Sequence, residues 1–246
     1  MPTMTRRSHL DLGTAHFQEA NQRVREALDD ADVVELGSVF AQRYLGCGMK
    51  AGKSLEIHGT PGNDMACYMD GGEIEVFGNA QDQIGNTMND GRIVIHGRCG
   101  DAAGYGMRGG SIFVRDDCGW RVGIHMKEYQ DKRPLIVIGG DAGSFLGEYM
   151  AGGVIVLMGT PGPYLASGMH GGVIYLRERP DDRQIAEGLV LEPVDESDAD
   201  AEELSSILDE HGRMFAGERE PCRPDVHGWW RLKPRSSRPY ESMYSN

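Results

Sequence analysis

The sequence predicts an all-β solenoid, namely a right-handed parallel β-helix of about seven coils of 19 residues each. Two observations predict it. A methionine, followed in most units by a glycine-rich tripeptide, recurs with successive spacings of 20, 19, 19, 19, 24 and 19 residues. Each unit then continues with two aliphatic residues in alternation, which is the pattern of a short strand. The repeat begins at Met49, Met69, Met88, Met107, Met126, Met150 and Met169.

The aliphatic pairs mark where the strands are expected. They are Leu55/Ile57, Ile74/Val76, Ile93/Ile95, Ile112/Val114, Ile136/Ile138, Ile155/Leu157 and Ile174/Leu176. Coils of this kind stack at about 4.8 Å, the spacing between paired strands. Equivalent residues then lie above one another, which places the aliphatic side chains and the methionines inside. Because no coil can bury its apolar face alone, the array needs neighbours and capped ends.

The glycines allow two interpretations. The stretch GDAGSFLGEYMAGG, residues 140–153, has glycines at spacings that also occur in phosphate-binding loops. Such a loop occurs once, between a strand and a helix, whereas this pattern returns in coil after coil. Of the 35 glycines, 29 lie between Gly46 and Gly172. The architectural interpretation is therefore favoured: glycine stands at bends where φ is positive or where close packing excludes a Cβ.

The segments that flank the array differ from it in composition. Residues 1–37 are expected to contain a capping helix over Thr14–Asp32, with Phe17, Val24 and Leu28 in helical periodicity. The β-helix is expected over residues 38–178. Residues 179–246 are expected to form an acidic helix, with Leu204, Ile207 and Leu208 on one side, and then an extended basic and aromatic arm.

The charge argues against nucleic acid as a partner. The chain has a net charge of −13, whereas a nucleic-acid-binding protein carries a basic stripe. Residues 178–226 alone hold 16 acidic and 5 basic residues. No apolar run approaches the ~18 residues that span a bilayer, and the first thirteen residues lack the apolar core of a secretory signal. The expected location is the cytoplasm, with no membrane partner.

Several stretches resemble a known family. GNAQDQIGNTMNDGRIVIHG, VGIHMKEY and FLGEYMAGG are similar to the third domain of the glutamate synthase large subunit, in its stand-alone archaeal-type form, often called the GXGXG domain. The resemblance covers the whole array, and RSSRPY at residues 235–240 also resembles the stand-alone subunits. A more distant resemblance is to the formylmethanofuran dehydrogenase subunit that carries similar glycine-rich coils.

The resemblance implies a division of labour. In glutamate synthase a glutamine amidotransferase unit releases ammonia, and an FMN-dependent synthase unit with an iron–sulfur cluster reduces the imine formed from ammonia and 2-oxoglutarate. The β-helix carries no chemistry and holds these units together. The chain is thus expected to be a non-catalytic subunit of an oxidoreductase complex for ammonia assimilation, with both cofactors in a partner subunit. Alternatives with the same scaffold are N-methylglutamate synthase and a formylmethanofuran dehydrogenase-type complex.

The residues themselves point to no catalytic, cofactor or metal site. The chain begins Met-Pro, so no N-terminal cysteine nucleophile is expected, and neither a cluster-binding cysteine motif nor HExxH occurs. His58 and His96 share a repeat position on either side of Phe77 and are expected to be solvated histidines at the strand edge. His125 and His170 flank the methionines and are expected to form hydrogen bonds at corners.

Two pairs of cysteines and one pair of aspartates share repeat positions. Cys99/Cys118 and Cys47/Cys67 are expected to stack within disulfide reach. The favoured interpretation is small buried thiols, with a redox role left open. Asp82 and Asp101 also stack, as the carboxylates of polysaccharide-cleaving β-helices do. Their neighbours include neither arginine nor a calcium-binding set, so that enzyme class is disfavoured.

Partner contacts are expected at two places. The coil with the 24-residue spacing contains KEYQDKRPL, residues 127–135, and insertions in solenoids form surface loops. The arm at residues 227–246 is rich in aromatic and arginine side chains, which dominate interface hot spots. Deletion of the arm is expected to weaken a complex without unfolding the β-helix.

Overall fold

A computed structural model of the chain describes residues 5–197, 199–218 and 225–236. One 11-stranded sheet dominates it, in which β1 to β9 follow in chain order and β11 and then β10 complete the edge. The strands are β1 (Arg7–Asp11), β2 (Val33–Phe40), β3 (Ser54–Thr60), β4 (Asp70–Phe77), β5 (Asp90–Ile95), β6 (Ser111–Val114), β7 (Leu135–Ile138), β8 (Ala151–Leu157), β9 (Gly171–Leu176), β10 (Leu189–Pro193) and β11 (Trp230–Pro234). The helices are α1 (Phe17–Asp30), α2 (Ala199–Met214) and a short 3₁₀ helix, Asp182–Gln184.

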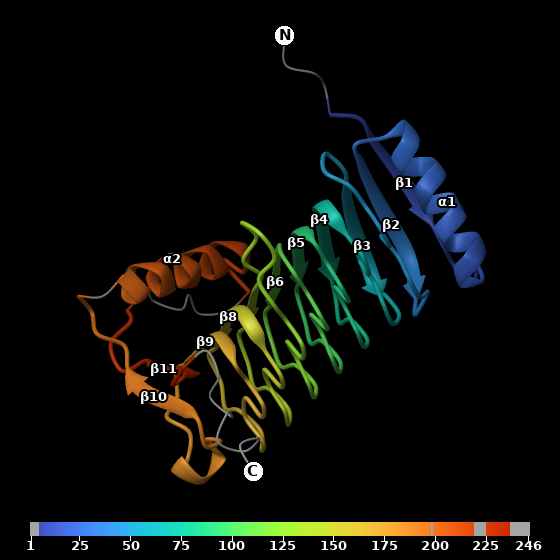
Figure 1. Ribbon diagram of the computed structural model, residues 1–246. Coiled ribbons are helices and arrows are strands. Elements are labelled where there is room, and N and C mark those ends of the chain that lie inside the picture. Colours follow the sequence, from blue (N-terminus) through green and yellow to red (C-terminus); the bar gives the residue numbers. More distant parts are fainter. Residues whose placement is uncertain (1–4, 198, 219–224, 237–246) are drawn as a thin grey trace.

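The parallel solenoid expected from the repeat is confirmed. Strands β3 to β9 pair in parallel with the register that the repeat implies, so that Leu55 lies beside Ile74, and Ile74 beside Ile93. Strand β2 adds one rung ahead of the seven expected, and the solenoid has about eight turns. Figure 1 shows these coils side by side, from the N-terminal end in blue to β9 in yellow.

The interior is a column of aliphatic and methionine side chains. Each strand of the array sends its alternate residues inward, and each long turn adds a methionine. The aliphatic pairs of β3 to β9 and six of the seven repeat methionines are fully buried, and Met49 at the first coil is 6% exposed. Each such side chain stabilises the fold by about 1.5–3 kcal/mol relative to an exposed one.

Glycine is required where one coil touches the next. A Cβ at Gly104, whose φ is 69°, would lie 2.4 Å from Cδ1 of Ile136 in the interior. A Cβ at Gly119 would lie 2.1 Å from Oδ1 of Asp101, one coil earlier. The first position needs glycine for the turn and the inner packing, and the second needs it to admit a neighbouring carboxylate.

The N-terminal end is closed by a helix, as expected, but a strand precedes that helix. Strand β1 pairs in parallel with β2, and α1 connects the two. Ala20 and Val24 of α1 are buried in the same cluster as the solenoid interior. Asn21 Nδ2 donates 2.7 Å hydrogen bonds to the carbonyl oxygens of Phe17 and Arg43, which ties the helix to the first corner.

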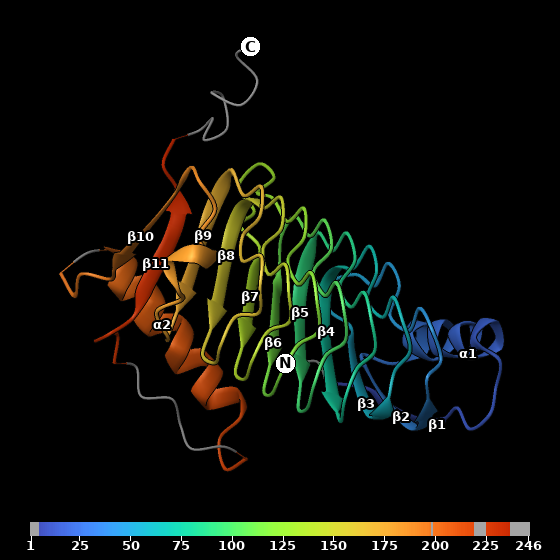
Figure 2. The ribbon, with the colours of Figure 1, turned by 90° about the horizontal axis from the view of Figure 1, so that it is seen from below.

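Helix α2 covers the outer face of the later strands. Leu204, Ile207 and Leu208, expected on one side of an acidic helix, are buried. They join a second apolar cluster with outward-facing residues of the sheet such as Phe113 and Tyr175. In Figure 1 the helix lies beside the later coils, and Figure 2 shows it crossing the sheet near β8 and β9.

The expected extended arm is instead partly built into the sheet. Strand β11 pairs antiparallel with both β9 and β10. Trp229 is 1% exposed and Leu232 is fully buried, so this stretch closes the C-terminal end of the core. The rest of the arm, residues 237–246, and most of RSSRPY lie outside the described residues. Neither α1 nor α2 has the length and apolar character that a bilayer crossing requires within the described chain.

Candidate functional site: an aromatic edge

The long turn of each coil presents outward side chains in an unusual backbone conformation. Three residues per turn have positive φ, for example Arg121 at 60°, Gly123 at 70° and His125 at 55°. Their N–H groups bond alternately to the next coil and to the previous one: Arg121 N donates to Ser144 O at 2.9 Å, and Gly123 N to Ala103 O at 2.8 Å. A non-glycine residue with positive φ costs roughly 1 kcal/mol, which these inter-coil bonds offset.

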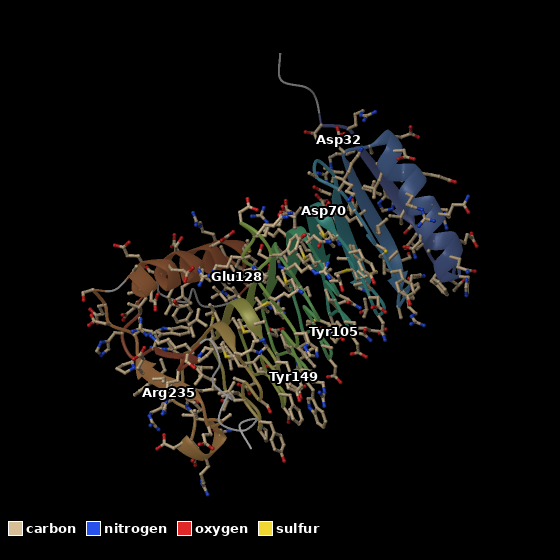
Figure 3. The ribbon with its side chains drawn as sticks, viewed as in Figure 1. Asp32, Asp70, Tyr105, Glu128, Tyr149 and Arg235 are labelled. Atoms are coloured by element: carbon tan, nitrogen blue, oxygen red, sulfur yellow. The ribbon has the colours of Figure 1, made fainter. Side chains whose placement is uncertain are left out.

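These turns line up aromatic side chains along one edge of the solenoid. We call the set the aromatic edge; it comprises Tyr68, Tyr105, Trp120, His125, Phe145, Tyr149 and Tyr164. Trp120 is 58% exposed, Tyr149 47% and Tyr164 63%. Figure 3 shows Tyr105 and Tyr149 along the same long edge, opposite the edge that carries Asp70 and Glu128. Large aromatic side chains left in water along one edge are typical of an interaction site.

The rings pack on one another from coil to coil. The imidazole of His125 stacks on Tyr149, with ring centroids 5.2 Å apart, and meets Tyr105 edge-on at 5.9 Å. Phe145 stacks on Tyr164 at 4.7 Å. Such contacts hold exposed rings in place, so little side-chain entropy remains to be lost when a partner binds.

An ion pair with a buried carboxylate anchors the middle of the edge. Glu148 is only 6% exposed, and its carboxylate pairs with the guanidinium of Arg121. The same guanidinium lies 4.6 Å from the ring centroid of Phe145. Charge and cation–π attraction therefore fix Arg121 against the ring, and the edge presents a cation among its aromatic groups.

The insertion at residues 127–135 lies on the opposite edge. It is a short hairpin in which Tyr129 and Lys132 exchange backbone hydrogen bonds of 3.1 Å. Lys132 Nζ reaches Asp90 at 3.0 Å and Asp70 at 3.6 Å, and Arg133 pairs with Glu203 of α2. The surface position expected of the insertion is confirmed, but much of its charge is engaged within the chain.

The four histidines considered from sequence fall into different environments. His58 is half exposed, as expected, and stacks on Phe77 at 4.8 Å. His96 stacks on the other side of Phe77 at 4.9 Å, but it is buried, and the expectation of a solvated side chain is wrong there. Its ring nitrogens lie 2.8 Å from Glu75 and 2.7 Å from Glu218, because the segment after α2 folds over it.

At the corners, the outcome for the other two histidines is mixed. His170 Nδ1 lies 3.2 Å from the carbonyl oxygen of Gly168, as expected of a corner histidine. His125 packs in the aromatic edge instead. No group of three or more histidine, cysteine or acidic side chains within the described ranges is arranged to hold a metal ion.

Asp82 and Asp101 are used by the backbone. Asp82 Oδ1 accepts a 2.9 Å hydrogen bond from Asp101 N, and Asp101 Oδ1 accepts one of 2.8 Å from Trp120 N. Each carboxylate thus holds the equivalent residue one coil further along. Asp141 does the same for Thr160 N at 2.7 Å, in a second ladder. These aspartates join the coils, which accounts for their periodic positions without any catalytic role.

The cysteine pairs stack as expected. Cys99 and Cys118 form a β-bridge between neighbouring coils, and both are buried free thiols. Cys67 is buried, whereas Cys47 is exposed, so the expected buried position holds for three of these four thiols. Cys222 lies outside the described residues.

Sequence reasoning missed the aromatic edge as a set, although the repeat contains the signal. Tyr68, His125 and Tyr149 all directly precede a repeat methionine. Phe145 and Tyr164 share another position, five residues before the methionine. Aligning the coils on the methionines would have placed these rings in neighbouring rows.

Comparisons with known proteins agree with this architecture. The family model described as the GXGXG motif matches residues 28–221. An uncharacterized protein of Methanocaldococcus jannaschii, MJ1350, is 49% identical over 150 residues, which cover 59% of this chain and 58% of that protein. The aligned part therefore spans under two thirds of this relative's length. The chain belongs to the GXGXG motif family, the family of the third domain of the glutamate synthase large subunit.

Proposed function

We propose that this chain is a non-catalytic scaffold subunit of a glutamate synthase-type complex. Its partners are a glutamine amidotransferase subunit and an FMN-dependent synthase subunit that also carries an iron–sulfur cluster. The complex converts glutamine, 2-oxoglutarate and reducing equivalents to two molecules of glutamate. Family membership supports the glutamate synthase-related role, and the single observation that carries the scaffold assignment is the aromatic edge.

The rigidity of the solenoid supports the scaffold role. The solenoid fixes the spacing of its corners through the inter-coil hydrogen bonds and the aspartate ladders. A partner that contacts Tyr149 and Tyr164 is therefore held at a defined position relative to one that contacts the insertion or α2. Such a fixed relation is what the passage of ammonia between two enzyme units needs, and it requires no reactive group on this chain.

The test is affinity capture of the tagged chain from its native cells, with mass spectrometry and an absorbance spectrum of the eluate. The expected result is an amidotransferase and a yellow-brown protein with flavin and iron–sulfur absorbance. A colourless chain that elutes alone would contradict the proposal, as would glutaminase turnover by the isolated chain. If the two captured enzyme units use a different ammonia acceptor, the scaffold role of this chain would stand, but the complex would not be a glutamate synthase.

Variants locate the docking surface. Tyr149→Ser and Tyr164→Ser change exposed rings of the aromatic edge, and Phe40→Ser is the matched control because Phe40 is 67% exposed at the end of β2. The edge variants are expected to lower partner recovery at least ~10-fold, as hot-spot aromatic residues do, and the control to keep it. Equal recovery of partners with the two edge variants and the control would mean that the docking surface is not the aromatic edge.

A truncation tests the arm separately. Deletion from residue 227, as the sequence first suggests, would remove Trp229 and Leu232 from the core. A loss of partners could then result from unfolding and would not by itself show that the arm binds them. A truncation after Ser236 leaves β11 intact. Loss of partners from that shorter truncation, with unchanged β-sheet circular dichroism, would assign binding to residues 237–246.

A further inference from the structure

Cys47 and Cys67 form an exposed and a buried member of one stacked pair. They occupy the same position in consecutive coils, and Gly48 N donates a 2.9 Å hydrogen bond to Cys67 O. Cys67 is 4% exposed, whereas Cys47 is exposed. The Cys67 thiol lies close enough to the Cys47 sulfur for the pKa of each to depend on the other. Neighbouring strands lie about 4.8 Å apart, which falls within the Cα separation that a disulfide can bridge.

The exposed thiol opens into a hollow between α1 and the first coil. The hollow has a volume of about 310 Å³, and Cys47 lies in its wall. Arg25, Lys50, Lys53 and Asp29 line it. Lys50 pairs with Asp70 and Lys53 lies 3.9 Å from Asp32, so Arg25 is the cation that acts on the sulfur. Val24, Leu28 and Met49 supply the apolar part of the wall. A small molecule can therefore approach the sulfur, in surroundings that favour a thiolate.

The exposed thiol of Cys47 is the more acidic of the two, and the buried thiol of Cys67 is the less acidic. A hydrogen bond with Cys67 and the positive charge of Arg25 lower the pKa of Cys47 to about 7, against the effect of burial and the carboxylate of Asp64. The same hydrogen bond, together with burial, raises the pKa of Cys67 well above its usual range. At neutral pH the exposed sulfur is the nucleophile and the buried one stays protonated.

We propose that Cys47 is a peroxide-reactive thiolate and that Cys67 resolves its oxidised form into a disulfide between the first two coils. The oxidant class is hydrogen peroxide or a small organic hydroperoxide. The Cys47 thiolate attacks one peroxide oxygen and the O–O bond breaks, which forms an S–OH group and releases hydroxide or an alkoxide that takes a proton from solvent to give water or an alcohol. The sulfur of Cys67 then displaces hydroxide from that group. The S–S bond forms, the thiol proton joins the hydroxide, and water leaves. Two thiols lose two electrons and the peroxide gains them.

The second cysteine pair is an internal control. Cys99 and Cys118 also stack on neighbouring coils, but they are 5% and 7% exposed. A hydrogen bond with Cys99 and burial raise the pKa of Cys118. Stacking is common to both pairs, whereas an exposed sulfur that opens into a hollow lined by Arg25 belongs to Cys47. If only the Cys47–Cys67 pair is oxidised, the cause is therefore the hollow beside Cys47 and not the stacking, which both pairs share.

The experiment uses the full chain with Cys222→Ser, reduced and then exposed to equimolar hydrogen peroxide at pH 7. Peptide mapping without reductant is expected to show a Cys47–Cys67 disulfide, with Cys99 and Cys118 still alkylatable after unfolding. Cys67→Ser should accumulate a sulfenic acid at Cys47 that dimedone traps, and Cys47→Ser should form no disulfide at Cys67. Iodoacetamide should alkylate Cys47 roughly 3-fold faster than free cysteine at this pH, because its larger thiolate fraction outweighs the lower nucleophilicity of a more acidic thiol.

Circular dichroism of each variant shows whether it folds. Oxidation of Cys99–Cys118 at the same rate would overturn the proposal, because stacking alone would then suffice. Alkylation of Cys47 no faster than that of free cysteine would overturn it as well, and so would a folded Cys67→Ser that forms no trappable sulfenic acid.

Discussion

The outer face of the sheet changes character halfway along the solenoid. One row of residues, in register from strand to strand, begins with Glu35, Glu56 and Glu75 on β2, β3 and β4. The same row continues on β5 to β9 with Val94, Phe113, Val137, Val156 and Tyr175, all of them buried. The two halves share an interior and a backbone. They differ in their outward-facing side chains, since a second row also changes from Ser54 and Glu73 to Val154 and Val173, and α2 covers only the apolar half.

The boundary between the halves is itself structured. His96, just after the end of β5, lies against Phe215 and between the carboxylates of Glu75 and Glu218. Arg115 also binds Glu218, at 2.7 Å. The segment that follows α2 is thus fixed where the acidic row meets the apolar one. The repeat thus determines the coils, and the outward-facing rows determine where the rest of the chain can lie.

The largest expected effect comes from removing a ring under the helix. Phe113→Ala empties a fully buried site between β6 and α2, and we expect a loss of about 3–5 kcal/mol in the free energy of unfolding. Phe77→Ala is the matched control, because Phe77 also faces outward but is 40% exposed between two imidazoles. Its loss should be about 1 kcal/mol, the size of its stacking contacts.

Denaturant unfolding followed by circular dichroism measures both variants. Similar losses for the two would mean that α2 contributes little to the stability of the face that it covers. The covered half and the open half would then not differ in what their outward-facing side chains contribute to the free energy of unfolding.

How much of this could be predicted depends on how local the information is. The coils were predictable because each repeats a pattern about 19 residues long, so the position of Ile74 predicts equivalent strand residues at Ile93 and Ile112. Helix α2 was predictable as an element from Leu204 and Leu208. Its position was not, because the apolar row from Val94 onward had to be separated from the interior row beside it. The signal existed in the outward positions, where glutamate gives way to valine and phenylalanine.

The ends and the candidate site were harder to predict for a different reason. Strands β1 and β11 lie outside the repeat, so its period does not predict them: β1 pairs with β2 across helix α1, and β11 pairs with β9 across β10 and α2. Trp229 therefore suggested an exposed arm, whereas it is buried. The aromatic edge was hidden because five of its seven rings sit at residues with positive φ, such as Tyr149 at 53°. Those positions favour glycine, and sequence reasoning treated them as architectural corners.

Tyr175 provides an intermediate effect, through pH. Its phenol is buried under α2 and donates a 3.2 Å hydrogen bond to Glu203. Burial, and then the charge of Glu203, raise its pKa well above the usual value of 10.0. The folded chain therefore keeps the phenol neutral where the unfolded chain ionises it. Its contribution is fully present below pH 10 and is lost as pH rises toward the folded pKa, by up to about 1.4 kcal/mol per pH unit.

Unfolding measured from pH 8 to pH 11 checks this expectation. Tyr175→Phe should begin slightly less stable, because Glu203 loses a donor, and should then fall less steeply with pH than the wild type. Tyr149→Phe replaces an exposed tyrosine of the aromatic edge and serves as the control. If the stabilities of the wild type and Tyr175→Phe fall equally with pH, the ionisation of Tyr175 is not the cause of the fall.

The smallest effect is expected in the acidic row. Glu56 is flanked in register by Glu35 and Glu75, and Arg7 pairs with it. Glu56→Ala removes an exposed ion pair worth about 0–1 kcal/mol, but it also removes repulsion between stacked carboxylates. We expect a net change within about 0.5 kcal/mol, which shrinks further at 1 M salt because both contributions are screened. Denaturant unfolding at low and high salt measures it. A loss above 1 kcal/mol that persists in salt would mean that the open half relies on this row as strongly as the covered half relies on α2.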